Sequence, residues 1–140
     1  MSKIGPRFKY LEQPIFCLCV IKDYVLVASG GGGKKFGVRN KILSYQILNN
    51  YKFSEEPLCS VEFEKEIPVF ISSYDLLNIF CVSVDNMTVF YSLDTLNGKF
   101  HEVTRLTTMD FFDPDIYQSV CRLDNKGKYL ATGTTEGILK

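Results

Sequence analysis

Short apolar segments follow one another along most of the chain. They are rich in β-branched and aromatic residues and are separated by turn-forming residues such as Lys22-Asp23 and Asn125-Lys126-Gly127. This is the pattern of strands joined by tight turns, and the apolar spacing that indicates a helix is nearly absent. The pattern therefore predicts an all-β meander with strands at Ile15–Ile21, Tyr24–Ser29, Lys41–Leu48, Leu58–Phe63, Val69–Ser73, Asn78–Val84, Met87–Leu93, Phe100–Leu106, Gln118–Leu123, Tyr129–Thr132 and from Ile138 onward.

The meander contains an internal repeat. Val27-Ala28-Ser29-Gly30 matches Leu130-Ala131-Thr132-Gly133 at an offset of 103 residues, and Val84–Val89 resembles Thr135–Leu139 at about half that offset. A unit of about fifty residues and four strands has the size of one blade of a β-propeller. The segment from Ile116 to Lys140, with its D-x-x-G-K turn and Leu-Ala-Thr-Gly strand, resembles the WD-repeat pattern, although the chain has no Trp and no Gly-His pair.

The 140 residues are therefore expected to form the N-terminal part of a single propeller domain. We expect blade 1 at about 10–63, blade 2 at about 67–106, and an incomplete blade 3 that begins at about 116. This makes about two and a half four-stranded blades, whereas a closed propeller has about 4–8. A truncated chain is the expectation that follows.

Composition narrows the function classes. Lys plus Arg and Asp plus Glu both number 16, so no global field attracts nucleic acid or an anionic membrane. No apolar stretch is long enough for a transmembrane helix and the N-terminus lacks the core of a signal peptide, so the chain is expected to be soluble and not secreted. The five cysteines, an odd number set in apolar runs, indicate reduced core residues in a cytosolic compartment.

A glycine-rich run from Gly30 to Asn40 interrupts the strands of blade 1. Other blades have only a short turn at this position, so the run is predicted to be an inserted loop at one rim, as binding loops on rigid scaffolds are. The alternative is an incidental flexible insertion, which costs little. The P-loop template fails because Lys35 replaces the Mg²⁺-binding hydroxyl, and the dinucleotide template fails because a strand follows the loop.

The segment from Val25 to Ile42 resembles the first-blade loop of the prolactin regulatory element-binding protein family. These are WD-repeat exchange factors of the endoplasmic reticulum for the Sar-type GTPase that starts COPII coat assembly. The shared elements are an apolar strand, four glycines, then Gly37, an aliphatic residue, a basic residue and Asn40. The late segment from Leu130 to Gly137 also fits. The resemblance implies a seven-bladed propeller with a C-terminal membrane anchor that lies outside this sequence.

The resemblance also implies a mechanism. The loop would bind a potassium ion through Gly30, Gly31, Gly32, Gly33, Gly37 and Asn40, and would contact the GTPase through Phe36, Val38, Arg39 and Lys41. The expected function is GDP release from the GTPase and COPII vesicle formation at the cytosolic face of the endoplasmic reticulum, without covalent catalysis and without nucleic acid. The alternative is a generic WD-repeat protein-interaction scaffold that has no exchange activity.

Other candidate chemistry is sparse. The segment from Asp110 to Asp115 brings three carboxylates together, but its aromatic pair and Pro favour a packed turn between blades over a catalytic dyad. His101 has no recognisable Ser or Cys partner and is interpreted as an isolated strand residue. No catalytic residue is therefore assigned.

Overall fold

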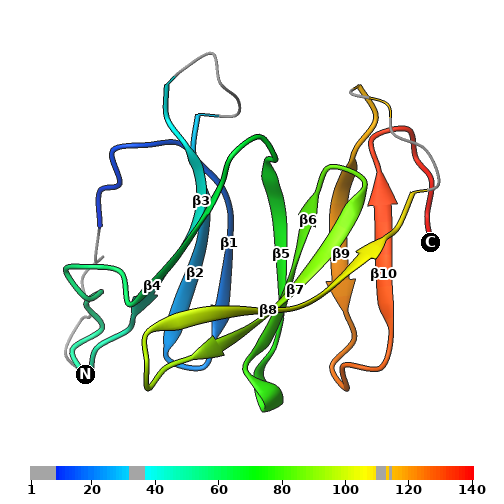
Figure 1. Cartoon of the computed structure of the whole chain (residues 1–140). Coiled ribbons are helices and arrows are strands. Elements are labelled where there is room, and N and C mark those ends of the chain that lie inside the picture. Colours follow the sequence, from blue (N-terminus) through cyan, green and yellow to red (C-terminus); the bar gives the residue numbers. More distant parts are fainter. Residues whose placement is uncertain (1–8, 32–36, 110–112, 114) are drawn as a thin grey trace, which may run out of the picture.

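The computed structural model describes residues 9–31, 37–109, 113 and 115–140. Within these residues the chain is a series of antiparallel strands (Figure 1). The strands are β1 (Ile15–Ile21), β2 (Tyr24–Ser29), β3 (Asn40–Gln46), β4 (Cys59–Phe63), β5 (Pro68–Tyr74), β6 (Ile79–Val84), β7 (Met87–Asp94), β8 (Lys99–Thr107), β9 (Gln118–Leu123) and β10 (Leu130–Thr134).

The strands form two four-stranded sheets and one two-stranded sheet. Their orders are β1-β2-β3-β4, β5-β6-β7-β8 and β10-β9, so each strand pairs with its neighbour in sequence. We call the three sheets blade 1, blade 2 and blade 3. The first strands of the blades lie next to one another, β1 beside β5 and β5 beside β9 (Figure 1). Each sheet therefore begins near a common centre and runs outward, as in a propeller.

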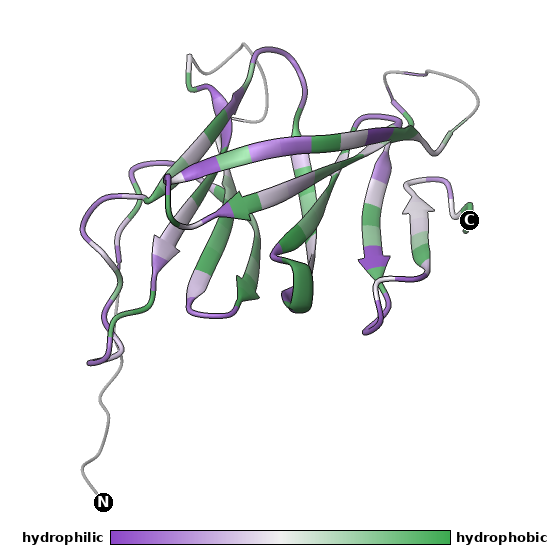
Figure 2. Cartoon of the chain, turned by 60° about the horizontal axis from the view of Figure 1, so that its bottom comes forward, coloured by the Kyte–Doolittle hydropathy of each residue, from purple (hydrophilic) through white to green (hydrophobic). Residues whose placement is uncertain are grey.

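The main hydrophobic core lies between blades 1 and 2. Leu26 and Ile42 of blade 1 are fully buried against Phe80, Val82 and Val89 of blade 2. Each large aliphatic or aromatic side chain buried in this way stabilises the fold by roughly 1.5–3 kcal/mol. The apolar segments of Figure 2 follow these central strands, whereas the connections at the strand ends are mostly polar. Burial on both faces explains why β6 and β7 are nearly continuous apolar runs.

Side-chain hydrogen bonds join the blades where the inner strands meet. Ser73 of β5 donates to the carbonyl of Val20 in β1 at 3.0 Å. Leu123 N of β9 donates to Ser72 Oγ at 3.0 Å. Cys81 and Cys121, both fully buried, have their sulfur atoms 3.6 Å apart across blades 2 and 3. This contact and burial raise the pKa of the Cys81 thiol, so Cys81 stays protonated at neutral pH and donates to the sulfur of Cys121.

The structure confirms the all-β prediction and most strand positions, with three corrections. Strand β3 begins at Asn40 and ends at Gln46, because Ile47 makes only an isolated bridge to Phe53. A short 3-10 helix at Asp75–Leu77 was not expected. Asn78 is its C-cap residue with φ +53°, so β6 begins one residue later than predicted, at Ile79. The predicted strand from Ile138 is only an isolated bridge between Gly133 and Leu139.

The five cysteines are free: Cys59, Cys81 and Cys121 are buried, whereas Cys17 and Cys19 are half-buried against the core. No helix within the described part of the chain has the length and apolar character needed to cross a bilayer.

Candidate functional site

One end of the sheets carries the connections between the second and third strand of each blade and between consecutive blades (Figure 1). We call this end the upper rim. Its connections differ in length: β6 and β7 are joined by the two residues Asp85-Asn86, whereas β2 and β3 are joined by the ten residues 30–39. Blade 1 therefore carries the inserted loop that the sequence predicted. The described residues of the upper rim are 30–31, 37–39, 64–67, 85–86, 108–109, 113, 115–117 and 135–137.

Gly30 closes the base of this loop at a point where a side chain does not fit. Its φ is +149° and its N–H donates to the carbonyl of Pro14 at 3.1 Å. A Cβ on Gly30 would lie 2.6 Å from the Cα of Asn40 and would overlap Asn40 Oδ1. Real Cβ atoms do not approach backbone this closely, so the two ends of the loop are adjacent only because residue 30 is glycine.

Asn40 holds the other end of the loop. The side chain is buried, and its Nδ2 donates to the carbonyl of Glu66 at 3.0 Å. Because only the NH₂ of the amide can donate to a carbonyl, this bond places Oδ1 on the opposite side, against Gly30. Asn40 thus ties the loop base to the connection between blades 1 and 2. We call the Gly30–Asn40 contact and this hydrogen bond the loop clasp.

The sequence placed Asn40 at the end of the loop, and the structure corrects this. Asn40 is the first residue of β3 and pairs with Phe63 of β4. Its buried amide therefore has a structural role irrespective of any ion. Oxygen atoms are the ligands that hard cations prefer, so the amide oxygen of Asn40 and the carbonyl of Gly30 are of the chemical type implied for potassium, and their role in ion binding stays a prediction.

The predicted GTPase-contact residues are displayed outward, as far as they are described. Arg39 Nη1 lies 2.8 Å from Glu62 Oε2, and both side chains are mostly exposed. The hydrogen bond and the charge of Glu62 raise the pKa of the Arg39 guanidinium. Val38 is exposed, and Lys41 is half-buried within β3. Gly37 has φ +68°, and within the described part of the chain no atom lies within 4 Å of where its Cβ would be.

The remaining predicted loop residues, Gly32, Gly33 and Phe36, lie outside the described residues. Gly31 is described and half-buried, but no side-chain chemistry distinguishes it. The roles assigned to these loop residues stay predictions.

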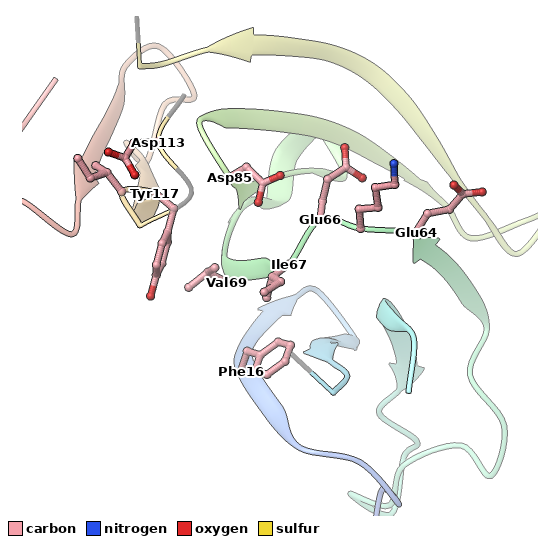
Figure 3. Close-up of a pocket in the computed structure, with 10 residues that line it drawn as sticks. Phe16, Glu64, Glu66, Ile67, Val69, Asp85, Asp113 and Tyr117 are labelled. Atoms are coloured by element: carbon pink, nitrogen blue, oxygen red, sulfur yellow. The ribbon is translucent and has the colours of Figure 1, made fainter. Parts of the chain in front are cut away.

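A cavity of about 950 Å³ opens on the upper rim beside the loop clasp (Figure 3). Residues of all three blades line it, and they combine apolar side chains with four carboxylates. The carboxylates belong to Glu64 and Glu66 between blades 1 and 2, Asp85 in the β6–β7 turn, and Asp113 between blades 2 and 3. The apolar part of the lining consists of Phe16, Ile67, Val69, Ile116 and Tyr117.

Asp85 is the carboxylate with the most unusual environment. Its φ is +50°, the left-handed region that Asp and Asn tolerate better than most residues. Burial and the neighbouring charge of Glu66 raise the pKa of the Asp85 carboxyl, although a hydrogen bond from the Ile67 backbone opposes this. Its backbone carbonyl accepts a hydrogen bond from Gln118 N at 2.7 Å, which fixes the turn against blade 3.

Gln118 is a second buried amide on the upper rim that sequence reasoning missed. It is completely buried, and its Nε2 donates to Ser83 Oγ at 2.7 Å and to Thr88 Oγ1 at 2.8 Å. Thr108 Oγ1 donates to its Oε1. A polar side chain at the start of a strand gave no signal in the sequence, because its partners come from blade 2, about thirty residues away.

Sequence reasoning also missed the acidic cavity. Glu62, Glu64 and Glu66 alternate in the sequence, which could have indicated an acidic connection, but nothing linked them to Asp85. The expected isolated His101 lies in β8 with Nε2 3.5 Å from Asp94 Oδ2. Across residues 9–31, 37–109, 113 and 115–140, no group of three or more His, Cys, Asp or Glu side chains is arranged to hold a metal ion.

Comparison with known proteins gives a fold. The chain matches no sequence family and no curated protein. The crystal structure of a Lactobacillus plantarum protein aligns with a TM-score of 0.68 at 14% identity, covering 91% of this chain and 40% of that one. The crystal structure of RRP9 WD40 repeats aligns with a TM-score of 0.61 at 8% identity, covering 85% and 34%. A structure described as COPII on membranes, outer coat vertex, aligns at 0.64 and 14% identity, covering 91% and 33%.

These similarities define the class of the fold: an all-β arrangement of antiparallel four-stranded sheets like the blades of WD40 β-propellers. The chain spans 40% or less of the length of each of these three proteins. The predicted propeller-type fold is therefore confirmed, whereas the particular family of exchange factors and the blade boundaries stay predictions.

Proposed function

We propose that this chain is the loop-bearing part of a guanine-nucleotide exchange factor for a Sar-type small GTPase, which promotes COPII vesicle formation at the cytosolic face of the endoplasmic reticulum. The observation that carries the proposal is the ten-residue connection between β2 and β3, clasped at its base and displayed on the upper rim. The resemblance of Val25–Ile42 to the first-blade loop of known exchange factors supplies the activity. The WD40-like fold is consistent with it.

Nucleotide exchange is a binding reaction. A factor accelerates GDP release when it binds the nucleotide-free GTPase more tightly than the GDP-bound form, and by linkage it then weakens the affinity for GDP. No covalent bond forms or breaks, so the proposal needs no catalytic residue. It needs a rigid element that fits the GTPase only when the nucleotide site is open.

The loop clasp supplies part of that rigidity. Gly30 and Asn40 hold the two ends of the loop together, and Asn40 fixes them to the blade 1–blade 2 connection. A loop whose ends are fixed before binding loses less conformational entropy when it docks. The clasp thus favours a fixed presentation of the exposed residues Val38 and Arg39.

Arg39 is suited to meet an acidic surface on the GTPase. Its guanidinium is held over β4 by Glu62, but the ion pair is mostly exposed to solvent. Exposed ion pairs contribute little to stability, so Arg39 can exchange Glu62 for a carboxylate of the partner at small cost. Lys41, two residues along, adds a second cation near the same edge.

The proposal includes a potassium ion bound by the loop. The residues that would hold it are Gly30, Gly31, Gly32, Gly33, Gly37 and Asn40, through oxygen atoms. The ion would supply positive charge that draws loop oxygens together and orders the loop. Asn40 orients its amide oxygen for this role by donating its NH₂ to Glu66.

A generic protein-interaction scaffold is the second candidate, since WD40-like blades support it without any special loop. In that case the loop would be incidental. The two proposals differ in one respect: only the exchange factor makes GDP release depend on residues 30–41.

The test is GDP release from a Sar-type GTPase, followed with a fluorescent GDP analogue and the full-length protein. Deletion of Gly31–Lys35 is expected to abolish the acceleration, and Arg39→Ala to reduce it at least about fivefold, as is common when a charged contact residue is removed. Replacement of potassium by sodium is expected to slow release by the unaltered protein. Lys99→Ala, at the opposite end of the blades, is the matched control. Unchanged release by the loop deletion would favour the scaffold.

A further inference from the structure

The exchange proposal uses the loop residues 30–41 and, of the residues that line the cavity beside the loop clasp, only the backbone carbonyl of Glu66. The side chains that line the cavity have no role in it. The cavity has a volume of about 950 Å³, within the range of about 300–1,000 Å³ usual for ligand sites. Its walls come from the blade 1–blade 2 connection, the β6–β7 turn, the blade 2–blade 3 connection and β1. Segments distant in the sequence therefore converge on one concave site.

The charge of the cavity is strongly one-sided. Four carboxylates line it, and Lys65 is the one basic residue among its lining residues in the described part of the chain. Arg105 approaches Glu66 at 3.4 Å but is already paired with Glu102 at 2.6 Å. The cavity is consequently complementary to a cation and opposed to phosphate, nucleic acid or an acidic peptide.

Asp85 lies in the cavity beside a second negative charge. Partial burial and the charge of the neighbouring Glu66 both disfavour its ionised form and raise its pKa, although a hydrogen bond from the Ile67 backbone opposes this. Figure 3 shows Asp85 and Glu66 near one another on one side of the cavity, with Phe16 and Val69 placed away from them. A cation that entered between the carboxylates and the apolar wall would relieve this repulsion.

The arrangement of the carboxylates selects the kind of cation. Within the described residues, no set of three acidic side chains is close enough together to chelate a metal ion. A guanidinium is wider, and its five N–H donors can bridge carboxylates that stand apart. Apolar and aromatic residues such as Phe16, Val69 and Tyr117 are suited to contact the methylenes of an arginine and to stack on its planar head.

We propose that this cavity is a docking site for an arginine side chain presented by an apolar-flanked segment of a partner protein. Asp85 and the neighbouring Glu66 receive the guanidinium (Figure 3), and Phe16, Ile67 and Val69 contact its stem and flanking residues. This inference does not depend on exchange activity, because none of its residues lies in the β2–β3 loop.

The probe for the test is the peptide acetyl-Ala-Leu-Arg-Leu-Ala-amide, titrated into the ¹⁵N-labelled full chain and followed by amide chemical shifts. The matched ligand has citrulline in place of arginine, which keeps the shape and removes the charge. We expect shifts at residues 64–67, 69, 85 and 116–117 with the arginine peptide. Binding of the citrulline peptide should be at least about tenfold weaker, as for the loss of a charged hydrogen bond.

Variants of the chain localise the effect. Asp85→Asn keeps a residue that accepts a positive φ and is expected to weaken the arginine peptide about fivefold or more, whereas Asp75→Asn at the opposite end of blade 2 should leave it unchanged. Glu66→Gln, which removes the neighbouring carboxylate and keeps the backbone carbonyl bound by Asn40, provides an independent variant should the first lower stability. Equal binding of the two peptides, the absence of shifts around the cavity, or unchanged binding by both cavity variants would overturn the proposal.

Discussion

Blade 1 and blade 2 solve the same structural problem differently at the upper rim. Both must connect their second and third strands, and blade 2 does so with Asp85-Asn86, the shortest connection that reverses a strand. Blade 1 uses the ten residues 30–39 at the same place. Yet the two blades pair their strands with continuous register on both sides of these connections. The added length is therefore unnecessary for the fold, and its presence calls for a functional reason.

A buried amide stands beside each of the two connections. Asn40 ties the blade 1 loop to the carbonyl of Glu66, and Gln118 ties the blade 2 turn to blade 3 through Ser83 and Thr88. Each amide is satisfied by groups outside its own strand. The long loop is thus anchored at its base by a buried amide, as the tight turn is, which favours a functional loop over an incidental insertion.

The largest expected effect on stability comes from Gly30→Ala. A Cβ there collides with Asn40, and the backbone has a positive φ, so the free energy of unfolding should fall by about 2–4 kcal/mol. The control is Gly37→Ala in the same loop, where the φ is +68°. Among the described residues, no atom lies within 4 Å of a Cβ built there. The free energy of unfolding should therefore fall by only about 1 kcal/mol. Urea unfolding midpoints measure both. Equal losses would show that the loop base is not clasped.

Replacement of each buried amide, Asn40 and Gln118, should distinguish local loosening of the blade 1 loop from a general loss of stability. Gln118→Leu leaves the hydroxyls of Ser83 and Thr88 without their partner and is expected to destabilise the chain by about 1–3 kcal/mol. Asn40→Ala should cost about 1–2 kcal/mol and should also speed amide hydrogen exchange at residues 37–39. Exchange at these residues should not change in Gln118→Leu beyond its global destabilisation. The reverse pattern would contradict the role given to Asn40.

A smaller, pH-dependent effect on the free energy of unfolding is expected from Asp85 in the blade 2 turn. Its pKa is raised in the folded chain above the ordinary value of 3.8, so the folded state binds the proton more tightly than the unfolded state. The ionised carboxylate therefore opposes folding at neutral pH, and this opposition disappears as the pH falls through the raised pKa toward 3.8. Asp85→Asn should be slightly more stable than the unaltered chain at pH 7, with the difference vanishing near pH 4 in unfolding titrations. A constant difference would show that Asp85 does not titrate in this way.

The smallest effect on stability is expected for Arg39→Ala. The Arg39–Glu62 pair is largely exposed, and such pairs contribute little. Its unfolding midpoint should match that of the unaltered chain, so a defect in GDP release would report the contact with the partner and not the fold. A clear drop in the midpoint would assign Arg39 to the structure of blade 1.

The sequence was sufficient for most of the strands because short apolar segments bounded by turn residues, such as Ile15–Ile21 and Met87–Leu93, can be recognised from neighbouring residues alone. Turn chemistry placed Asp85-Asn86 correctly for the same local reason. The sequence was insufficient at Asn78, which was predicted to begin a strand but is a left-handed residue after a 3-10 helix. It was also insufficient beyond Gln46, where β3 was predicted to continue but Ile47 makes only an isolated bridge.

The candidate site likewise has features that could be predicted from the sequence and features that could not. The position and length of the inserted loop could be predicted from the repeat, since a repeat aligns the blades. The burial of Asn40 and the Gly30–Asn40 contact could not, because they depend on how closely two strands approach. The acidic cavity was beyond prediction, since Glu64, Asp85 and Asp113 come together only when three blades pack.

The most direct test of the central claim is a footprint of the nucleotide-free Sar-type GTPase on the full-length protein, measured by amide hydrogen exchange. We expect slower exchange at residues 37–41 of blade 1 when the GTPase is bound. Exchange should not change at residues 95–98, the β7–β8 turn at the opposite end of the blades. Unchanged exchange at residues 37–41, with or without protection elsewhere, would contradict the claim that the blade 1 loop engages the GTPase.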